Sequence, residues 1–127
     1  MKIFLDTADV DLIEKYYGTG LIDGVTTNPT LIKKSGYDPE EVYRKIALIG
    51  VDDISMEIVT DDSYEFLKEG RRLKEKFGEI TTIKVPCTPE GLKGCKLLSK
   101  EGIRVNVTLI FSAAQAVLAS KAGAAYV

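Results

Sequence analysis

Short runs of apolar and β-branched residues alternate along the chain with longer amphipathic stretches. The runs lie at 2–6, 24–28, 54–58, 81–85, 104–108 and, cut short, 125–127. Each run has the length and composition of a β-strand, and the stretches between them have the spacing of amphipathic helices. Strict alternation of strands and helices predicts right-handed βαβ crossovers and therefore a parallel sheet.

Helix boundary signals support this order of elements. Asp38-Pro39-Glu40 and Thr88-Pro89-Glu90 each place an N-cap before an N1 proline and an acidic first turn, and Asp62 with Glu65 forms a capping box. Three glycines follow lysine-containing turns and predict helix ends: Gly78, Gly102 and Gly123. We interpret the acidic pairs Asp52-Asp53 and Asp61-Asp62 as helix caps in turns rather than as metal ligands.

Strand starts recur about every 20 to 30 residues, which fits either a (β/α)₈ barrel or a doubly wound sheet. No GxGxxG or GxxxxGK[ST] motif follows any strand, so the nucleotide-binding fingerprints of the doubly wound class are absent. The sequence therefore predicts an α/β fold of the parallel (β/α)₈ TIM-barrel class. Residues 1–127 would form a single partial barrel domain containing the first five to six βα units.

Alternation within the strands separates two sets of side chains, because residues two apart point to the same face. The apolar set is Ile3, Leu5, Val25, Ile54, Met56, Ile58, Ile83, Val85, Val105 and Val107, and we expect it to pack under helices. The polar set is Asp6, Thr26, Asn28, Ser55, Glu57, Thr82, Lys84, Asn106 and Thr108. A covered parallel strand is usually apolar throughout, so polar residues that share one parity at the strand ends indicate a functional site at the barrel mouth.

Composition removes several classes of chemistry. The 127 residues contain no histidine, which excludes Ser-His-Asp and Cys-His machinery and histidine metal sites. The net charge is −2 and basic residues are dispersed, so we expect no nucleic-acid partner. No apolar run is long enough to span a bilayer or to form a signal-peptide core, so we expect no membrane association and a cytoplasmic location. Cys87 and Cys95 lack zinc or redox spacing and are interpreted as reduced thiols.

Lys84 is the centre of the polar set. A lone lysine at a strand end can extend its amine to solvent as a purely structural residue. Here, however, two other predicted strands carry the carboxylates Asp6 and Glu57, and the sequence shows no metal cluster or cofactor motif. An amine that forms a Schiff base with a carbonyl substrate is the chemistry that this inventory serves best.

The other polar residues fit around such an amine. Asp6 and Glu57 would carry protons. The hydroxyl and amide groups are those that a polyhydroxylated substrate or an ordered water requires as partners. They belong to Thr26, Asn28, Ser55, Asn106 and Thr108.

Five segments make the chain similar to the small transaldolases and the related fructose 6-phosphate aldolases. They are MKIFLDTADVDLIEKY, GLIDGVTTNPTLI, SMEIV, IKVPCTPEGLKG and VNVTLIFS, and the pairing of TTNPT with KVPCT is the most specific feature. The resemblance covers essentially the whole chain. It implies a class I aldol mechanism on a (β/α)₈ barrel, with sugar phosphates as substrates and no cofactor.

The resemblance also assigns roles to individual residues. Lys84 matches the Schiff-base lysine, and Asp6 matches the acid-base that takes the C4 hydroxyl proton of the ketose. Glu57 and Thr108 match the pair that holds a catalytic water. Asn28, Ser55 and Asn106 match residues that contact the dihydroxyacetone unit.

Two alternatives stay open at this point. The aldolase branch of the family has Gln where this chain has Glu57, so the carboxylate favours a transaldolase over a fructose 6-phosphate aldolase. The family continues past Val127 with further strands and a phosphate-binding arginine, so residues 1–127 alone would be a catalytically silent structural fragment if nothing completed them. Open barrel edges would then favour self-association, and we expect a homo-oligomer. A pyridoxal phosphate protein that uses Lys84 is disfavoured, because no phosphate-cradling glycine loop is present.

Overall fold

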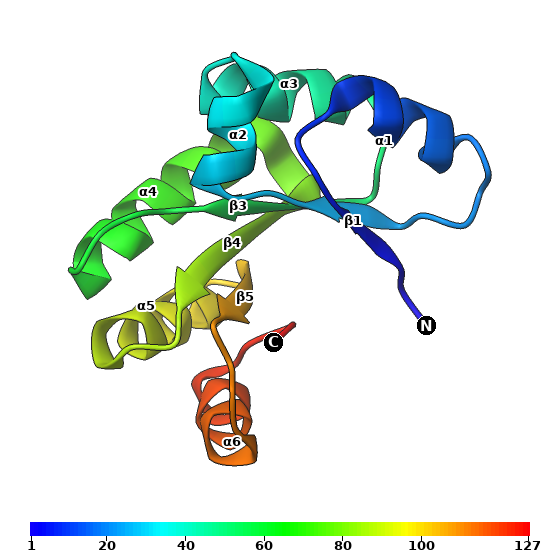
Figure 1. Ribbon diagram of the computed structural model, residues 1–127. Coiled ribbons are helices and arrows are strands. Elements are labelled where there is room, and N and C mark those ends of the chain that lie inside the picture. Colours follow the sequence, from blue (N-terminus) through cyan, green and yellow to red (C-terminus); the bar gives the residue numbers. More distant parts are fainter. The chain divides into compact units, whose positions relative to one another are not determined.

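Strands and helices alternate along the chain in the computed structural model, which describes residues 1–127 (Figure 1). The strands are β1 (Phe4–Asp6), β2 (Gly24–Thr26), β3 (Asp53–Glu57), β4 (Thr81–Pro86) and β5 (Arg104–Thr108). The helices are α1 (Val10–Tyr17), α2 (Pro29–Ser35), α3 (Pro39–Ile49), α4 (Ser63–Phe77), the 3₁₀ turn η1 (Gly78–Ile80), α5 (Pro89–Lys100) and α6 (Ala113–Ala122). The chain divides into two compact units, Met1–Met56 and Glu57–Val127, so the boundary falls within β3.

The first unit contains β1 and β2 and most of β3. β1 pairs with β2 in parallel, and β2 pairs with β3 in parallel through Val25 and Ile54. Helix α3 contacts both α1 and α2 in this unit (Figure 1). Its core includes the fully buried side chains of Ile13, Val25 and Ile46, which come from a helix, a strand and a second helix.

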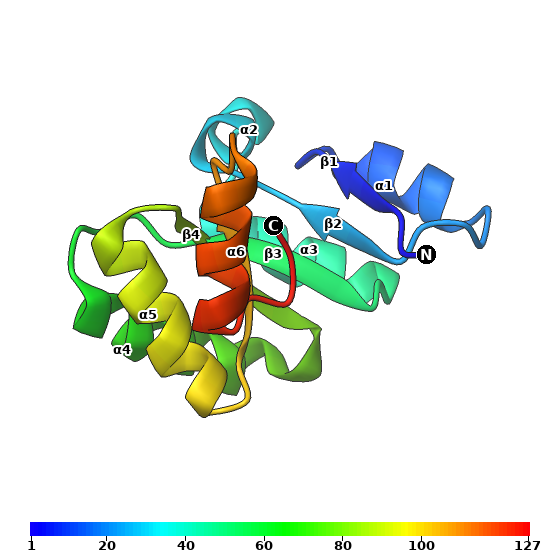
Figure 2. The same ribbon diagram turned by 90° about the horizontal axis from the view of Figure 1, so that it is seen from below.

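The second unit contains β4 and β5, paired in parallel over five residue pairs, and helices α4, α5 and α6. Helix α5 packs against α4 on one side and α6 on the other (Figure 2). A parallel bridge joins Asn106 to Tyr126, and the backbone N–H of Val107 donates to the carbonyl of Tyr126. The short apolar run at 125–127 thus takes the strand position beside β5 that the sequence predicts.

Helix boundaries agree closely with the predicted signals. Asp38, Asp62 and Thr88 are N-caps whose side chains accept hydrogen bonds from the first helical turns. Gly78 and Gly123 end α4 and α6 as predicted. At α5 the cap is Glu101, and Gly102 follows it with a φ of 73°, a left-handed conformation that favours glycine.

The prediction that Asp52 and Asp53 cap a helix is wrong. Asp53 is the first residue of β3 and is 1% exposed, while Asp52 precedes the strand. The nearest helix start, at α4, has its own cap in Asp62. Two adjacent acidic residues resemble a turn in sequence, but here the β2–β3 pairing at Gly24 and Asp53 draws the second one into the strand.

The division of strand residues into two faces is confirmed for four of the five strands. Every apolar residue predicted to pack under helices in β2 to β5, from Val25 to Val107, is buried. The exceptions are at β1: Ile3 lies before the strand and is 41% exposed, and Leu5 is only partly buried. Five parallel strands alternating with helices make up the βα repeat predicted from the sequence. None of the helices combines the length and the apolar character needed to cross a membrane.

Candidate active site

Lys84 and Glu57 form an ion pair at the carboxyl ends of β4 and β3. Their Nζ and Oε2 atoms lie 3.2 Å apart, and their side chains are 11% and 23% exposed. Most of both side chains is therefore covered. Such a largely enclosed amine beside a carboxylate is the arrangement that sequence reasoning predicted for a carbonyl-directed nucleophile.

The backbone of β4 fixes the position of Lys84. Its neighbours in the strand, Ile83 and Val85, are fully buried on the opposite face, so alternation directs Lys84 away from them. The backbone N–H of Ile58 donates to the carbonyl of Lys84 over 3.3 Å. Because Ile58 directly follows Glu57, this bond sets the end of β3 beside Lys84.

β5 brings the predicted residues Asn106 and Thr108 to the same face. Asn106 is in register with Lys84, and Thr108 is in register with Pro86. The backbone N–H of Cys87 donates to the carbonyl of Thr108 over 3.0 Å, which extends the pairing beyond the strands. Asn106 and Thr108 are both partly exposed, so they lie at the rim where a ligand can reach them.

Thr82 shares the parity of Lys84 but lies deeper. It is fully buried two residues before the lysine, in register with Arg104. The polar residues of this face therefore lie at two depths. Lys84 and Glu57 lie near the surface, and Thr82 lies in the interior beneath them.

The first unit holds the remaining predicted residues. Asp6 and Thr26 are directly opposite each other in the β1–β2 pair, and the Thr26 hydroxyl donates to Asp6 Oδ1 over 2.9 Å. Ser55 is in register with Thr26 and is fully buried. A carboxylate held by a threonine hydroxyl at a strand end is well placed to exchange a proton with a ligand.

Asn28 has a structural role that the sequence analysis did not assign. It lies beyond β2 and is the N-cap of α2, where its side-chain oxygen accepts from the backbone N–H of Leu31 over 2.9 Å. The signal was present, because Pro29 follows Asn28 just as Pro39 follows Asp38. Capping uses the oxygen of the Asn28 amide and leaves its NH₂ group for a ligand.

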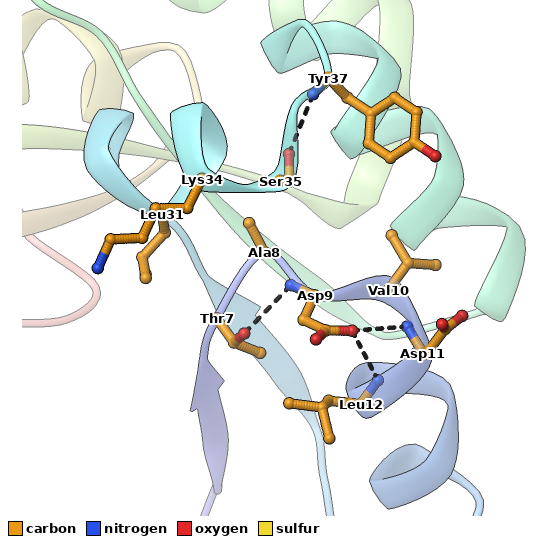
Figure 3. Close-up of a pocket in the computed structure, with 10 residues that line it drawn as sticks. All are labelled: Thr7, Ala8, Asp9, Val10, Asp11, Leu12, Leu31, Lys34, Ser35 and Tyr37. Carbon is orange, nitrogen blue, oxygen red and sulfur yellow. Dashed lines mark hydrogen bonds between the residues drawn. The ribbon is translucent and has the colours of Figure 1, made fainter.

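A cavity of about 470 Å³ lies in the first unit, immediately after the end of β1 (Figure 3). Its polar lining is used locally: Thr7 accepts from the N–H of Asp9, and Asp9 accepts from Asp11 and Leu12 at the start of α1. Across the cavity, Ser35 accepts from the N–H of Tyr37. These hydrogen bonds shape the loop that follows Asp6 rather than converge on a ligand.

Both cysteines are free, and Cys95 is buried. Burial raises the pKa of the Cys95 thiol to about 11. No group of three or more Cys, Asp or Glu side chains is arranged to hold a metal ion.

Residues 3–127 match the model of the "Transaldolase/Fructose-6-phosphate aldolase" family, and the chain belongs to that family. This confirms the resemblance predicted from the sequence.

Among curated relatives, a "Probable transaldolase" of Nitrosopumilus maritimus is 50% identical over all 127 residues. Proteins of the same description from Methanococcus maripaludis and a Thermoanaerobacter species are 54% and 53% identical, also over the whole chain. The chain spans 57% to 59% of the length of these relatives.

Proposed function

We propose that the protein carrying this chain is a transaldolase that works through a Schiff base at Lys84. The observation that carries the proposal is the 3.2 Å pairing of Lys84 with Glu57 at the strand ends. Family membership supports the reaction class, and the relatives described as probable transaldolases support the branch. The proposed substrates are a ketose phosphate, such as fructose 6-phosphate or sedoheptulose 7-phosphate, and an aldose phosphate acceptor.

The first half of the proposed reaction forms the imine. The neutral amine of Lys84 attacks the C2 carbonyl of the ketose, giving a carbinolamine that loses water. Glu57 lies within reach of the nitrogen and shuttles protons through a water that it holds with Thr108.

The second half cleaves and transfers. Asp6 takes the proton of the C4 hydroxyl, the C3–C4 bond breaks, and its electron pair passes into the imine to form an enamine. The aldose product leaves, and the enamine carbon attacks the aldehyde of the acceptor while Asp6 returns the proton to the new hydroxyl. Water then adds to C2 of the new imine, and the C–N bond breaks to release the ketose product and regenerate the Lys84 amine. The Thr26 hydroxyl orients the Asp6 carboxylate for both steps. Asn28 and Asn106 contact the three-carbon unit, and Ser55, which is fully buried, helps to hold the site.

Reductive trapping tests the proposal. Borohydride added during incubation with fructose 6-phosphate should convert the imine to a stable secondary amine, and peptide mapping should place the adduct on Lys84. The variant Lys84→Met should yield no adduct. The nearby surface lysines Lys93 and Lys96 provide internal controls, since an adduct on either of them in an active protein would refute the assignment.

The proposal also covers the oligomeric state and the location of the protein. We propose that the protein is a homo-oligomer located in the cytoplasm. Light scattering of the purified protein and fractionation of the source cells test these two expectations directly.

A further inference from the structure

The N-terminus of α4 receives a carboxylate from the neighbouring helix. Glu90, in the first turn of α5, accepts a hydrogen bond from the backbone N–H of Ser63 over 3.1 Å. Asp62, the N-cap of α4, accepts from Tyr64 and Glu65 but not from Ser63. Asp62 therefore leaves the N–H of Ser63 without an acceptor in α4, and Glu90 provides that acceptor.

The surroundings of Glu90 favour its charged form. The hydroxyl and backbone N–H of Ser63, followed by the charge of Lys93, lower the pKa of the Glu90 carboxyl. Of the two Ser63 groups, the N–H makes the hydrogen bond of good geometry, while the hydroxyl is fully buried beside it. Lys93 also lies over the ring of Tyr64, so contacts between the two helix starts surround the carboxylate.

The β3–α4 and β4–α5 loops are joined by a hydrogen bond at each of their ends. The Ser63–Glu90 contact joins them where the helices begin, and the other bond joins them beside Lys84 and Glu57. At the strand ends, Ile58 donates to the carbonyl of Lys84. At the helix starts, Ser63 donates to Glu90. Between these two bonds lie the loop from Glu57 to α4 and the loop from Lys84 to α5.

We infer that Glu90 is a positioning residue, which holds the β3–α4 loop in place and thereby keeps Glu57 against Lys84. The effect of Glu90 on catalysis rests on the proposed function, whereas its effect on the position of Glu57 does not. Glu90 has no direct contact with Lys84 or Glu57 in this role. It acts through the loop whose two ends are tied.

The same pair of helices offers a matched control. Arg71 of α4 makes two hydrogen bonds to Glu101, the C-cap residue of α5. Glu101→Ala removes a carboxylate and one α4–α5 tie, as Glu90→Ala does, but at the end of α5 remote from the β4–α5 loop. A general loosening of the helix pair would affect both variants alike.

The Glu57–Lys84 apposition can be measured without any substrate. A carbodiimide activates a carboxylate, and an adjacent amine then displaces the activating group to form an amide, so mass spectrometry can quantify a Glu57–Lys84 cross-link. In the protein expressed from its complete coding sequence, we expect Glu90→Ala to lower this cross-link yield about fivefold, the factor that corresponds to one capping hydrogen bond. Glu101→Ala should match the wild type, and Glu90→Gln, which keeps an acceptor oxygen, should restore most of the yield.

A second variant breaks the bond from the other side. Ser63 is the first residue of α4, a position that tolerates proline, and Asp62 before it has the extended conformation that proline requires. Ser63→Pro removes the N–H and leaves Glu90 intact, so it should reproduce the loss seen in Glu90→Ala. This variant keeps the inference testable if Glu90→Ala does not fold.

The outcomes separate the two claims. If folded Glu90→Ala and Ser63→Pro proteins cross-link as well as the wild type, or if the wild type gives no Glu57–Lys84 cross-link, the positioning role is refuted. Borohydride trapping of fructose 6-phosphate in the same variants reads the proposed function. A wild-type protein that cross-links normally but never traps the sugar would refute the Schiff-base proposal and leave the role of Glu90 standing.

Discussion

Asp6 and Thr26 face each other across the β1–β2 pair, with the Thr26 hydroxyl donating to Asp6 Oδ1 over 2.9 Å. The next residue, Thr27, points the other way, is fully buried, and donates to the carbonyl of Ser55 over 3.1 Å. The hydroxyls of two adjacent threonines therefore donate in different directions, the first to a candidate catalytic carboxylate and the second to a backbone carbonyl within the core.

We predict that Thr26→Val lowers kcat about tenfold with little change in thermal stability, because the exposed Asp6 carboxylate loses the donor that orients it. Steady-state kinetics of transfer from fructose 6-phosphate to erythrose 4-phosphate, together with thermal unfolding, would measure both effects.

The control is Thr27→Val, for which the effects should reverse. Loss of its buried hydrogen bond to Ser55 should cost about 1 kcal/mol of stability while kcat stays near the wild-type value. Equal losses of activity in the two variants would contradict a specific role for Thr26.

Glu57→Gln should move the enzyme toward simple aldol cleavage. Removing the carboxylate beside Lys84 alters the proton transfers that follow C–C cleavage, so transfer to an aldose acceptor should fall by about tenfold or more. Release of free dihydroxyacetone without an acceptor should rise relative to transfer. Assays of fructose 6-phosphate with and without erythrose 4-phosphate measure this ratio.

Glu65→Gln is the matched control for that experiment. It makes the same substitution on the exposed surface of α4, where Glu65 pairs with Lys68. Glu65→Gln should leave the ratio of release to transfer unchanged. If Glu57→Gln also left it unchanged, the assignment of the transaldolase branch through Glu57 would fail.

Gly91→Ala should strongly destabilise the turn after Lys84. A Cβ at position 91 would overlap the backbone carbonyl oxygen of Pro86, and backbone cannot move aside as a flexible side chain can. We expect a loss of about 2 to 3 kcal/mol in the free energy of unfolding, measured by chemical denaturation. Gly18→Ala places a Cβ in ordinary contact at a right-handed φ of −59° and should be close to neutral, within about 0.5 kcal/mol.

Cys95 should be unreactive and should make stability fall at alkaline pH. Its buried thiol has a pKa raised to about 11, whereas an unfolded thiol ionises near pH ~8.5. The unfolded state therefore loses the proton first, and stability should decline from about pH 8.5 to about pH 11. Cys95→Ala should remove that part of the decline in denaturation experiments.

Alkylation gives a second measurement of the same environment. Iodoacetamide at pH 8 should label the partly exposed Cys87 in the native protein and should label Cys95 after unfolding. Rapid native labelling of Cys95 would contradict its enclosure.

Local patterns were sufficient to predict most of the fold. Apolar runs located all five strands, and cap residues such as Asp62 and Thr88 located helix starts to the residue. Both signals act over a few neighbouring residues, so one sequence contains them fully. The prediction that Asp53 caps a helix failed because its place in β3 depends on pairing with Gly24, 29 positions earlier, which no local pattern encodes.

The candidate site was predictable in part for the same reason. Strand parity placed Glu57 and Lys84 on one face, but their 3.2 Å separation required the fold. The contact between Ser63 and Glu90 joins two helix starts 27 residues apart and left no periodic signal. Asn28 is a different case, because the proline that follows it is a cap signal that the sequence contains in full.

The pairing of each strand with its predecessor in the chain has a consequence for synthesis on the ribosome. β2 needs only β1 for its first ladder, and β3 needs only β2 for the next, so all the hydrogen bonds that join these three strands link residues made by position 57. The same holds for β5, which pairs with the already synthesised β4. Each connection between paired strands is a helical crossover that has already been synthesised when the later strand emerges, so the ladders can assemble in the order of translation without waiting for residues made later.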